Sequence, residues 1–579
     1  MERIWLRSYP PGVPAEISVD PSDSLPALLA RVCEHHALRP AFTNQGATIS
    51  YDDLDTLSLA FAAYLQKVAG LKKGERVAIM LPNLLQYPVA LFGVLRAGCV
   101  VVNTNPLYTA PELERQLADC GASALVVLDN FAHTAEQVLS RTRVRHVVVS
   151  ALGDMLHFPR AQIVNLVVRH VRHMVPEWHI DGADSFMEAL SEGQQQSLEH
   201  VQLAADDTAF LQYTGGTTGV PKGAVLSHGN VLANLEQTVA WVNGVLAQGE
   251  ETAIIPLPLY HIFALTTTLA FLRLAARNVL ITNPRDTDAL VRELRHNRFS
   301  AMIGVNTLFN ALLDAPHIEH VNQGGIKVVV AGGMAVQRAV AERWHKRFGV
   351  PLIEGYGLTE TSPIVSANPL TIPAYTGTIG LPLPSTDVAI RDDAGNELGI
   401  GEAGEICVRG PQVMQCYWRR PDETAEVLAA DGWLRTGDIG AIDAAGYLRL
   451  VDRKKDVIVV SGFKVFPNEV EDAAMLHPDV FEVAAMAAAD EHSGEAVKLV
   501  VVRRNPGLSA EALLAHMRLH LTGYKVPRYV VFRDEPLPKS NIGKVLRRVV
   551  REEEDKAGRS ASAACDPAQE PARHGPVTG

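Results

Sequence analysis

The chain contains one segment from which both its architecture and its chemistry can be inferred: Tyr213-Thr214-Gly215-Gly216-Thr217-Thr218-Gly219-Val220-Pro221-Lys222-Gly223. Its glycines allow backbone N–H groups to turn toward an anion without a Cβ in the way. Its threonine hydroxyls add donors, and its lysine adds a positive charge. The segment therefore predicts a loop that holds the phosphates of a nucleotide.

The spacing within this segment differs from that of the P-loop of kinases and GTPases. That pattern, G-x-x-x-x-G-K-[ST], places the lysine directly after the last glycine. Here Lys222 comes three residues after Gly219, behind Pro221. We therefore expect a nucleotide site outside the standard P-loop class. The alternative is a glycine-rich surface turn, which the density of hydroxyls beside a lysine disfavours.

Length and composition bound the class of protein. A chain of 579 residues is too long for one core and should form several domains. Its hydrophobic content of 47% is that of an ordinary soluble protein. The net charge of −12 argues against nucleic acid as a partner. Six cysteines without a C-x-x-C pair, and no apolar signal core at the N-terminus, favour a cytoplasmic location.

Short β-branched runs alternate with helical patterns through the first part of the chain, for example at 76–80, 125–128 and 146–149. This alternation predicts an α/β fold with largely parallel, buried sheets, and a second α/β region from about 205 to 360. Frequent glycines and short strands from 376 to 451 predict a small β subdomain. We expect a large N-terminal domain (1–453), a small mobile α+β domain (454–556) and a disordered tail (557–579).

Three further motifs carry groups suited to a nucleotide. Gly355-Tyr356-Gly357-Leu358-Thr359-Glu360 offers an aromatic ring for a base and a carboxylate for Mg²⁺. Trp433-Leu434-Arg435-Thr436-Gly437-Asp438 places a carboxylate where ribose hydroxyls can donate to it, although a turn aspartate is an equal alternative. Pro536-Leu537-Pro538-Lys539-Ser540-Asn541-Ile542-Gly543-Lys544 places a lysine behind a glycine.

In this order the motifs resemble those of the adenylate-forming superfamily, which contains acyl-CoA ligases, luciferases and adenylation domains of peptide synthetases. The resemblance runs from about Trp5 to Arg551. Within the superfamily the chain is similar to bacterial long-chain fatty-acid–CoA ligases, on the stretches 84–93, 257–265, 304–310, 451–456 and 459–463. The resemblance implies that ATP and CoA are cosubstrates and that Mg²⁺ is the cofactor.

The resemblance also implies a role for each motif residue. The ATP phosphates would be held by Thr214, Gly215, Gly216, Thr217, Thr218, Gly219 and Lys222. The rest of the nucleotide would be held by Gly332, Gly333, Tyr356, Gly357, Thr359, Asp438 and Arg453. Catalysis would involve Thr214, His261 beside the acyl carboxylate, Glu360 on Mg²⁺ and Lys544 as the adenylation lysine. Lys455 would be the hinge, and Gly462 would border the CoA channel.

The implied reaction activates a long-chain fatty acid to acyl-CoA through an acyl-adenylate. We expect Phe263, Leu265, Val305 and Leu308 to line an apolar tunnel for the chain. Some long-chain members carry a gating tryptophan four residues after the histidine, where Leu265 stands here, so that gate cannot be carried over. The alternatives are a fatty-acyl-AMP ligase that loads a carrier protein, a medium-chain ligase, and a non-catalytic relic. The first would carry an insertion near 461–468, and none is present.

One segment has the pattern of a helix that lies on a membrane surface. Ile163, Val164, Val167, Val168, Val171, Met174 and Val175 recur at helical spacing, with Arg169, His170, Arg172 and His173 between them. Such a basic amphipathic helix favours peripheral contact with the inner face of the cytoplasmic membrane. The alternative, an ordinary helix that packs its apolar stripe on the core, is slightly preferred.

Overall fold

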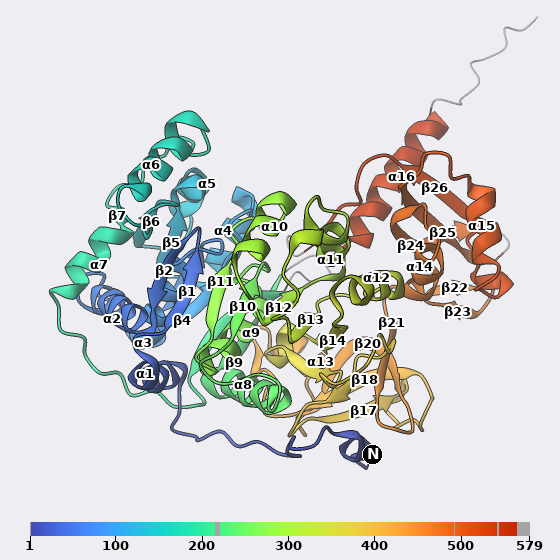
Figure 1. Cartoon of the computed structure of the whole chain (residues 1–579), viewed down its shortest axis with the longest axis horizontal. Coiled ribbons are helices and arrows are strands. Elements are labelled where there is room, and N and C mark those ends of the chain that lie inside the picture. The colour runs from blue at the N-terminus through green and yellow to red at the C-terminus, as the bar shows by residue number, and fades with distance from the viewer. Residues whose placement is uncertain (1, 215–220, 491–492, 541–542, 564–579) are drawn as a thin grey trace, which may run out of the picture. The chain divides into compact units, whose positions relative to one another are not determined.

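The computed structural model describes residues 2–214, 221–490, 493–540 and 543–563. The chain forms two compact units (Figure 1). The first contains residues 1–455 and 541–543; the second contains 456–540 and the chain from Lys544 onward. No helix in the described part of the chain is both long and apolar enough to cross a lipid bilayer.

An eight-stranded sheet in the first unit carries the hairpin that ends in the phosphate segment. Its strand order is β19-β9-β8-β4-β3-β5-β6-β7, parallel from β8 to β7 and antiparallel at β9 and β19. The strands are β3 (Arg76–Met80), β4 (Val100–Asn103), β5 (Ala124–Leu128), β6 (His146–Ser150), β7 (Asp184–Ser185), β8 (Thr208–Thr214), β9 (Lys222–Ser227) and β19 (Cys416–Tyr417). Their near-continuous apolar runs are buried, as expected for parallel strands covered on both faces.

A nine-stranded sheet has the order β16-β15-β14-β13-β12-β10-β11-β1-β2 and is parallel from β14 to β1. Its strands are β1 (Pro40–Asn44), β2 (Ala47–Ser50), β10 (Thr252–Ile255), β11 (Arg277–Leu280), β12 (Ala301–Gly304), β13 (Val328–Ala331), β14 (Leu352–Gly357), β15 (Ile364–Ala367) and β16 (Leu381–Pro382). The expected division of the α/β part near residue 205 is therefore wrong for the sheets: β1 and β2 join the later strands, and β8 and β9 join the earlier ones.

Thirteen α-helices are described in the first unit, and they cover the faces of these sheets. They are α1 (Leu25–His36), α2 (Tyr51–Lys67), α3 (Gln86–Arg96), α4 (Ala110–Cys120), α5 (Asp129–Leu139), α6 (Arg160–Leu166), α7 (Phe186–Gln194), α8 (His228–Val242), α9 (Ile262–Arg273), α10 (Thr287–His296), α11 (Asn306–Leu313), α12 (Arg338–Phe348) and α13 (Pro421–Val427). The apolar run at 253–272 forms most of β10 and α9, and every α9 residue from Ile262 to Leu272 is buried.

The predicted β subdomain is a four-stranded antiparallel sheet of order β17-β18-β20-β21. It contains β17 (Asp387–Arg391), β18 (Gly404–Arg409), β20 (Leu434–Ile442) and β21 (Leu448–Arg453). Gly446 turns the chain between β20 and β21 with a φ of +89°. A Cβ there would lie 2.3 Å from the Cα of Trp5, so only glycine fits this contact.

The second unit, red in Figure 1, packs helices on one five-stranded sheet. Its elements are β22 (Ile458–Val460), β23 (Phe463–Val465), α14 (Pro467–Met475), β24 (Val480–Asp490), β25 (Gly494–Arg503), α15 (Ala510–Met517), β26 (Tyr529–Arg533) and α16 (Arg547–Ala563). The predicted disordered tail begins too early, because α16 continues through Ala563. The Glu- and Lys-rich stretch 552–556 directly before this tail favours helix, Arg548 pairs with Glu552 one turn on, and the alanines at 557, 561 and 563 are compatible with its continuation. Residues 564–579 lie outside the described part.

Candidate active site

The phosphate segment forms the end of an antiparallel hairpin. β8 ends at Thr214, β9 begins at Lys222, and these two residues are direct cross-strand partners. The intervening Gly215, Gly216, Thr217, Thr218 and Gly219 lie outside the described residues. The hairpin therefore places Thr214 and Lys222 side by side at the two ends of the predicted phosphate loop.

Two side chains from elsewhere in the chain contact the groups at this hairpin. The Lys222 Nζ lies 2.5 Å from the Glu423 Oε2 and 5.2 Å from the centre of the Tyr417 ring. The Tyr417 hydroxyl donates to the Glu360 Oε1 at 2.6 Å. The predicted phosphate lysine and the predicted metal ligand therefore contact the same tyrosine, Lys222 over its ring and Glu360 at its hydroxyl.

A second cluster joins three of the predicted nucleotide residues. The Tyr356 hydroxyl donates to the Asp438 Oδ2 at 2.8 Å, and the Arg453 Nε lies 3.6 Å from the Asp438 Oδ1. Asp438 and Arg453 are cross-strand partners of β20 and β21, which explains why they meet. Burial, and then the charge of Asp438, raise the pKa of Tyr356 well above its ordinary value, so the phenol stays a donor.

The Tyr356 ring is less open than the flanking glycines suggest. It is 7% exposed and packs with the core of the first unit. Gly357 has a different reason for being glycine, because a Cβ there would lie 1.9 Å from the Pro363 carbonyl oxygen. Thr359 and Glu360 follow in a 3₁₀ turn, η4 (Thr359–Thr361), and both are half-buried.

The sequence analysis missed Glu405, a buried carboxylate beside the turn that precedes Asp438. Glu405 accepts from the Arg435 Nη2 at 2.7 Å and from the Gly437 N–H at 3.1 Å, and the Lys454 Nζ lies 3.4 Å away. Burial would raise the pKa of Glu405, but the hydrogen bond from Arg435 and the two positive charges hold it below its ordinary value. Glu405 therefore fixes the backbone directly before Asp438.

The expected acyl side of the site lies on α9 and β12–β13. His261 caps α9, its Nδ1 accepting from the Phe263 N–H at 3.4 Å. A Cβ on Gly332 would lie 3.0–3.4 Å from the Phe263 ring, so a glycine keeps that ring in place. Gly333 follows with a φ of +76°. Of the four residues expected to line the tunnel, Phe263, Leu265 and Val305 belong to one buried apolar cluster, and the partly buried Leu308 packs against it.

Two of the predicted residues belong to the second unit, and the hinge residue lies at its boundary. The Lys544 carbonyl accepts from the Ser540 N–H at 2.7 Å. Gly462 forms the β22–β23 turn with a φ of +85°, and a Cβ there would meet open space. The first unit ends at Lys455 before resuming at 541.

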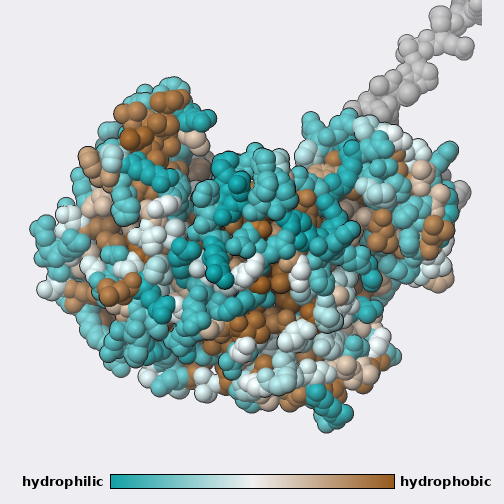
Figure 2. Space-filling model, in the orientation of Figure 1, coloured by the Kyte–Doolittle hydropathy of each residue, from teal (hydrophilic) through white to brown (hydrophobic). Residues whose placement is uncertain are grey.

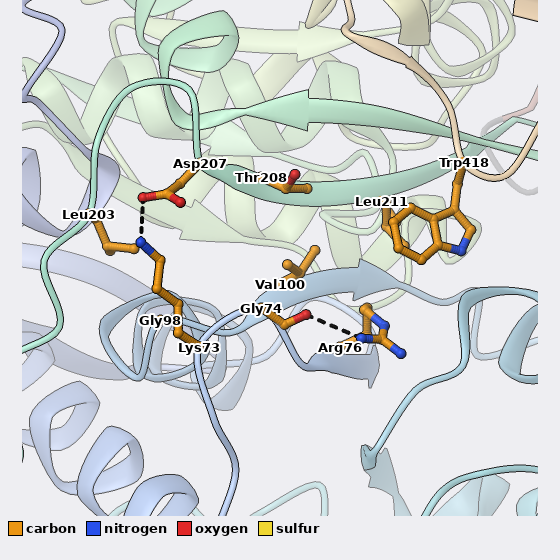
Figure 3. A pocket seen from close by; sticks show the side chains of 10 residues that line it. All are labelled: Lys73, Gly74, Arg76, Gly98, Val100, Leu203, Asp207, Thr208, Leu211 and Trp418. Carbon is orange, nitrogen blue, oxygen red and sulfur yellow. Dashed lines mark hydrogen bonds and ion pairs between the residues drawn. The ribbon is translucent and has the colours of Figure 1, made fainter. Parts of the chain in front are cut away.

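Figure 3 shows a small cavity of about 170 Å³ in the first unit, lined by Lys73, Arg76, Asp207, Thr208, Trp418 and others. Lys73 and Asp207 form an ion pair across it at 2.8 Å. It opens near Thr208, where β8 begins, whereas the phosphate hairpin lies beyond Thr214, where β8 ends. Ligands of parallel α/β sheets bind at the carboxyl ends of the strands, so this cavity is not the nucleotide site.

Comparison with known proteins assigns the class. Residues 29–418 match the family of AMP-binding enzymes, and residues 469–544 match the AMP-binding enzyme C-terminal domain. The chain therefore belongs to the AMP-binding enzyme family, and the resemblance drawn from the sequence is confirmed.

Relatives within the family indicate which kind of AMP-binding enzyme the chain resembles. The chain is 54% identical to a long-chain-fatty-acid–CoA ligase of Salmonella typhimurium, over 96% of this chain and 98% of that protein. It is 37% identical to a long-chain-fatty-acid–CoA ligase of Bacillus subtilis, over 96% and 98%.

Solved structures show the same fold. The ATP-bound MatB of Rhodopseudomonas palustris superposes with a TM-score of 0.79 at 27% identity, over 92% of this chain and all of that one. An anthranilate CoA ligase in complex with anthranoyl-AMP superposes with a TM-score of 0.82 at 23% identity, over 93% and 99%.

Proposed function

We propose that this enzyme converts a long-chain fatty acid, ATP and CoA into acyl-CoA, AMP and pyrophosphate through an acyl-adenylate. The observation that carries the proposal is the clustering of Lys222, Glu360 and the Asp438–Tyr356–Arg453 group around the hairpin and β14. These are groups for phosphates, a divalent cation and a nucleoside. The names of the relatives, long-chain-fatty-acid–CoA ligases, support a long-chain fatty acid as the substrate.

In the first step the fatty carboxylate attacks the α-phosphate of ATP. The new bond joins the carboxylate oxygen to phosphorus, and the bond to the β-phosphate oxygen breaks to release pyrophosphate. No general base is needed because the carboxylate is already the nucleophile. The obstacle is that an anion attacks a polyanion, so positive groups at the phosphates dominate catalysis. Lys222 and Lys544 supply them, and His261 and Thr214 orient the carboxylate and phosphates.

The donor set fits a divalent cation. Glu360 offers a carboxylate that is held in place by Tyr417, and Mg²⁺ bound to ATP commonly uses one or two protein carboxylates plus phosphate oxygens. Glu360 would hold the ion, whose charge would offset that of the phosphates.

In the second step the CoA thiol attacks the acyl carbonyl carbon and AMP leaves. A free thiol has a pKa of about 8.5, so a useful thiolate fraction exists near neutrality. The second step needs a channel through which the CoA thiol reaches the acyl group, whereas the first step needs a lysine at the phosphates. The small domain therefore turns about Lys455, removing Lys544 and presenting Gly462 to the pantetheine arm.

The test is AMP release with ATP, Mg²⁺ and CoA across fatty acids of four to eighteen carbons and benzoate-type acids, with CoA omitted in parallel. We expect CoA-dependent turnover that peaks at twelve to eighteen carbons. A peak at shorter chains would make the enzyme a medium-chain ligase. Acyl-AMP that accumulates while CoA is present would favour a ligase that loads a carrier protein.

We also propose that the enzyme contacts an anionic membrane surface through the apolar patch around α6. The helix expected over 163–178 is shorter: α6 ends at Leu166 and a π-helical turn, η2 (Val167–Val171), follows. The apolar side chains there do not all pack on the core. Phe158, Leu166 and Val171 are 82%, 57% and 62% exposed. Figure 2 shows a brown patch at the upper left, where Figure 1 places α6.

The charge of this patch suits anionic headgroups. His170, Arg172 and His173 are exposed beside the apolar side chains. Exposed apolar patches edged with basic residues are typical of surfaces that lie in the lipid headgroup region. Long-chain fatty acids partition into bilayers, so a docked enzyme would meet its substrate at a high local concentration.

Vesicle co-sedimentation tests the membrane contact. We expect a Phe158→Ser/Leu166→Ser/Val171→Ser variant to lose at least about tenfold in affinity for vesicles that contain anionic lipid, because it removes three exposed apolar side chains that would be buried among the lipid headgroups. The matched control is Leu38→Ser/Leu519→Ser, which removes leucines that are 93% and 79% exposed elsewhere. Arg172→Glu should weaken binding to anionic vesicles only. Equal sedimentation of wild type and the triple variant would contradict the proposal.

A further inference from the structure

A short segment, residues 416–424, surrounds the base of the phosphate hairpin, and we refer to it as the collar. Cys416 and Tyr417 pair antiparallel with Val225 and Ala224 of β9. The Trp418 N–H donates to the Gly223 carbonyl at 2.7 Å. The collar is therefore hydrogen-bonded to the strand that begins at Lys222, although it comes about two hundred residues later in the chain.

From this position the collar contacts the metal-binding carboxylate. Tyr417 is 8% exposed, and its hydroxyl donates to the Glu360 Oε1. An ionised carboxylate can only accept, so the Tyr417 hydroxyl is the donor in this hydrogen bond. A carboxylate has about four lone-pair sites, so this hydrogen bond orients Glu360 without using up its capacity to bind a cation.

The collar also holds both ends of the phosphate segment through charged groups. At one end, Glu423 pairs with Lys222 at 2.5 Å. At the other end, the Arg420 Nη2 donates to the Asp119 Oδ1 at 3.0 Å, and the Asp119 Oδ2 accepts from the Tyr213 hydroxyl at 2.5 Å. The Arg420 Nε lies 3.4 Å from the Glu423 Oε1, so this ion pair connects the contacts at the two ends of the segment.

We infer that Tyr417 and Glu423 are positioning residues of the adenylation step. Tyr417 orients the carboxylate of Glu360, and Glu423 orients the ammonium of Lys222. A lysine ammonium has three N–H donors, so one can bind Glu423 while others meet phosphate oxygens. Ordering this flexible side chain before ATP arrives lowers the entropy cost of binding. The inference rests on the proposed function of the site.

The first test measures ATP binding by equilibrium dialysis, which does not depend on turnover. Glu423→Gln keeps the shape and one acceptor but loses the charge that holds Lys222. We expect ATP to bind about tenfold more weakly, the size of a lost charge-assisted hydrogen bond. Tighter ATP binding would overturn the inference, because it would mean that Glu423 competes with the phosphates for Lys222. Unchanged binding would overturn it as well.

The second test separates Tyr417 from Glu423 through Mg²⁺. Tyr417→Phe keeps the ring under Lys222 and removes only the hydroxyl on Glu360. We expect ATP binding without Mg²⁺ to be unchanged, and the Mg²⁺ concentration for half-maximal stimulation of ATP binding to rise several-fold. Equal Mg²⁺ dependence in wild type and variant would contradict a role in orienting Glu360.

Asp422→Asn and Glu426→Gln are matched controls, since both remove an exposed carboxylate from α13 on either side of Glu423. Both should bind ATP as wild type does. The test distinguishes two failures. If the wild type forms no acyl-CoA, the proposed function fails. If the wild type is active and Glu423→Gln and Tyr417→Phe bind ATP and Mg²⁺ normally, only the inference about the collar fails.

Discussion

Replacing Lys544 by alanine should slow the formation of acyl-adenylate by about 10²–10³-fold, the usual cost of one electrostatic contact in a transition state. The second half-reaction should be spared, because in the proposed mechanism thioester formation depends on a CoA channel near Gly462 and not on a lysine at the phosphates. The measurement is pyrophosphate release without CoA, beside acyl-CoA formation from supplied acyl-AMP.

Lys556→Ala is the control for this experiment, because it removes an exposed lysine from α16 of the same unit. It should leave both half-reactions unchanged. If Lys544→Ala slowed both half-reactions equally, Lys544 would not be specific to adenylation, and the alternation of the small domain about Lys455 would lose its support.

Replacing Asp438 by asparagine should raise the KM for ATP by about 10–100-fold. We expect the ribose hydroxyls to donate to this carboxylate, and hydrogen bonds to a charged group contribute about 1.5–3 kcal/mol. The amide still accepts from the Tyr356 hydroxyl, so the fold around β20 should be kept. The turnover number should change much less than KM, because the ribose is bound equally in the ground and transition states. Steady-state kinetics at varied ATP concentration measures both constants.

Asp431→Asn supplies the comparison, since Asp431 is an exposed carboxylate in the turn before β20. It should leave the KM for ATP unchanged. A fall in the turnover number of Asp438→Asn without a rise in KM would show that Asp438 acts on the transition state and not on the ribose.

Much of the fold follows from local sequence. The β-branched runs at 76–80 and 146–149 are strands, and the glycine turns before β20 and between β20 and β21 have positive φ values at Gly432 and Gly446. The motif that holds Tyr356 and Glu360 forms a strand end and a 3₁₀ turn. These features depend on neighbouring residues, and so a pattern in the sequence is enough to predict them.

Other features depend on contacts between distant residues. Pairing across the sheet places β1 beside β11, with β2 on the outer side of β1, and no local pattern encodes that choice. The collar was missed because Tyr417 and Glu423 look like an ordinary aromatic and an ordinary helix-terminal acid in the sequence. Glu405 was missed for the same reason, since only the fold brings Arg435 and Lys454 to it.

The apolar repeat at 163–175 shows a different limit. A helical hydrophobic pattern indicates that one face is apolar, but it does not say what covers that face. The structure leaves Ile163, Val171 and Met174 more than half exposed, whereas Val164 packs on the core. The pattern is therefore compatible with both of the alternatives that the sequence left open.

The proposed function requires that the enzyme forms an acyl-adenylate intermediate. Exchange of labelled pyrophosphate into ATP, with a fatty acid present and CoA absent, tests it most directly, because exchange requires reversible attack on the α-phosphate. We expect exchange that depends on a fatty acid of twelve to eighteen carbons and is lost in Lys544→Ala. Absence of exchange, together with CoA-dependent release of ADP and phosphate, would contradict the proposed function.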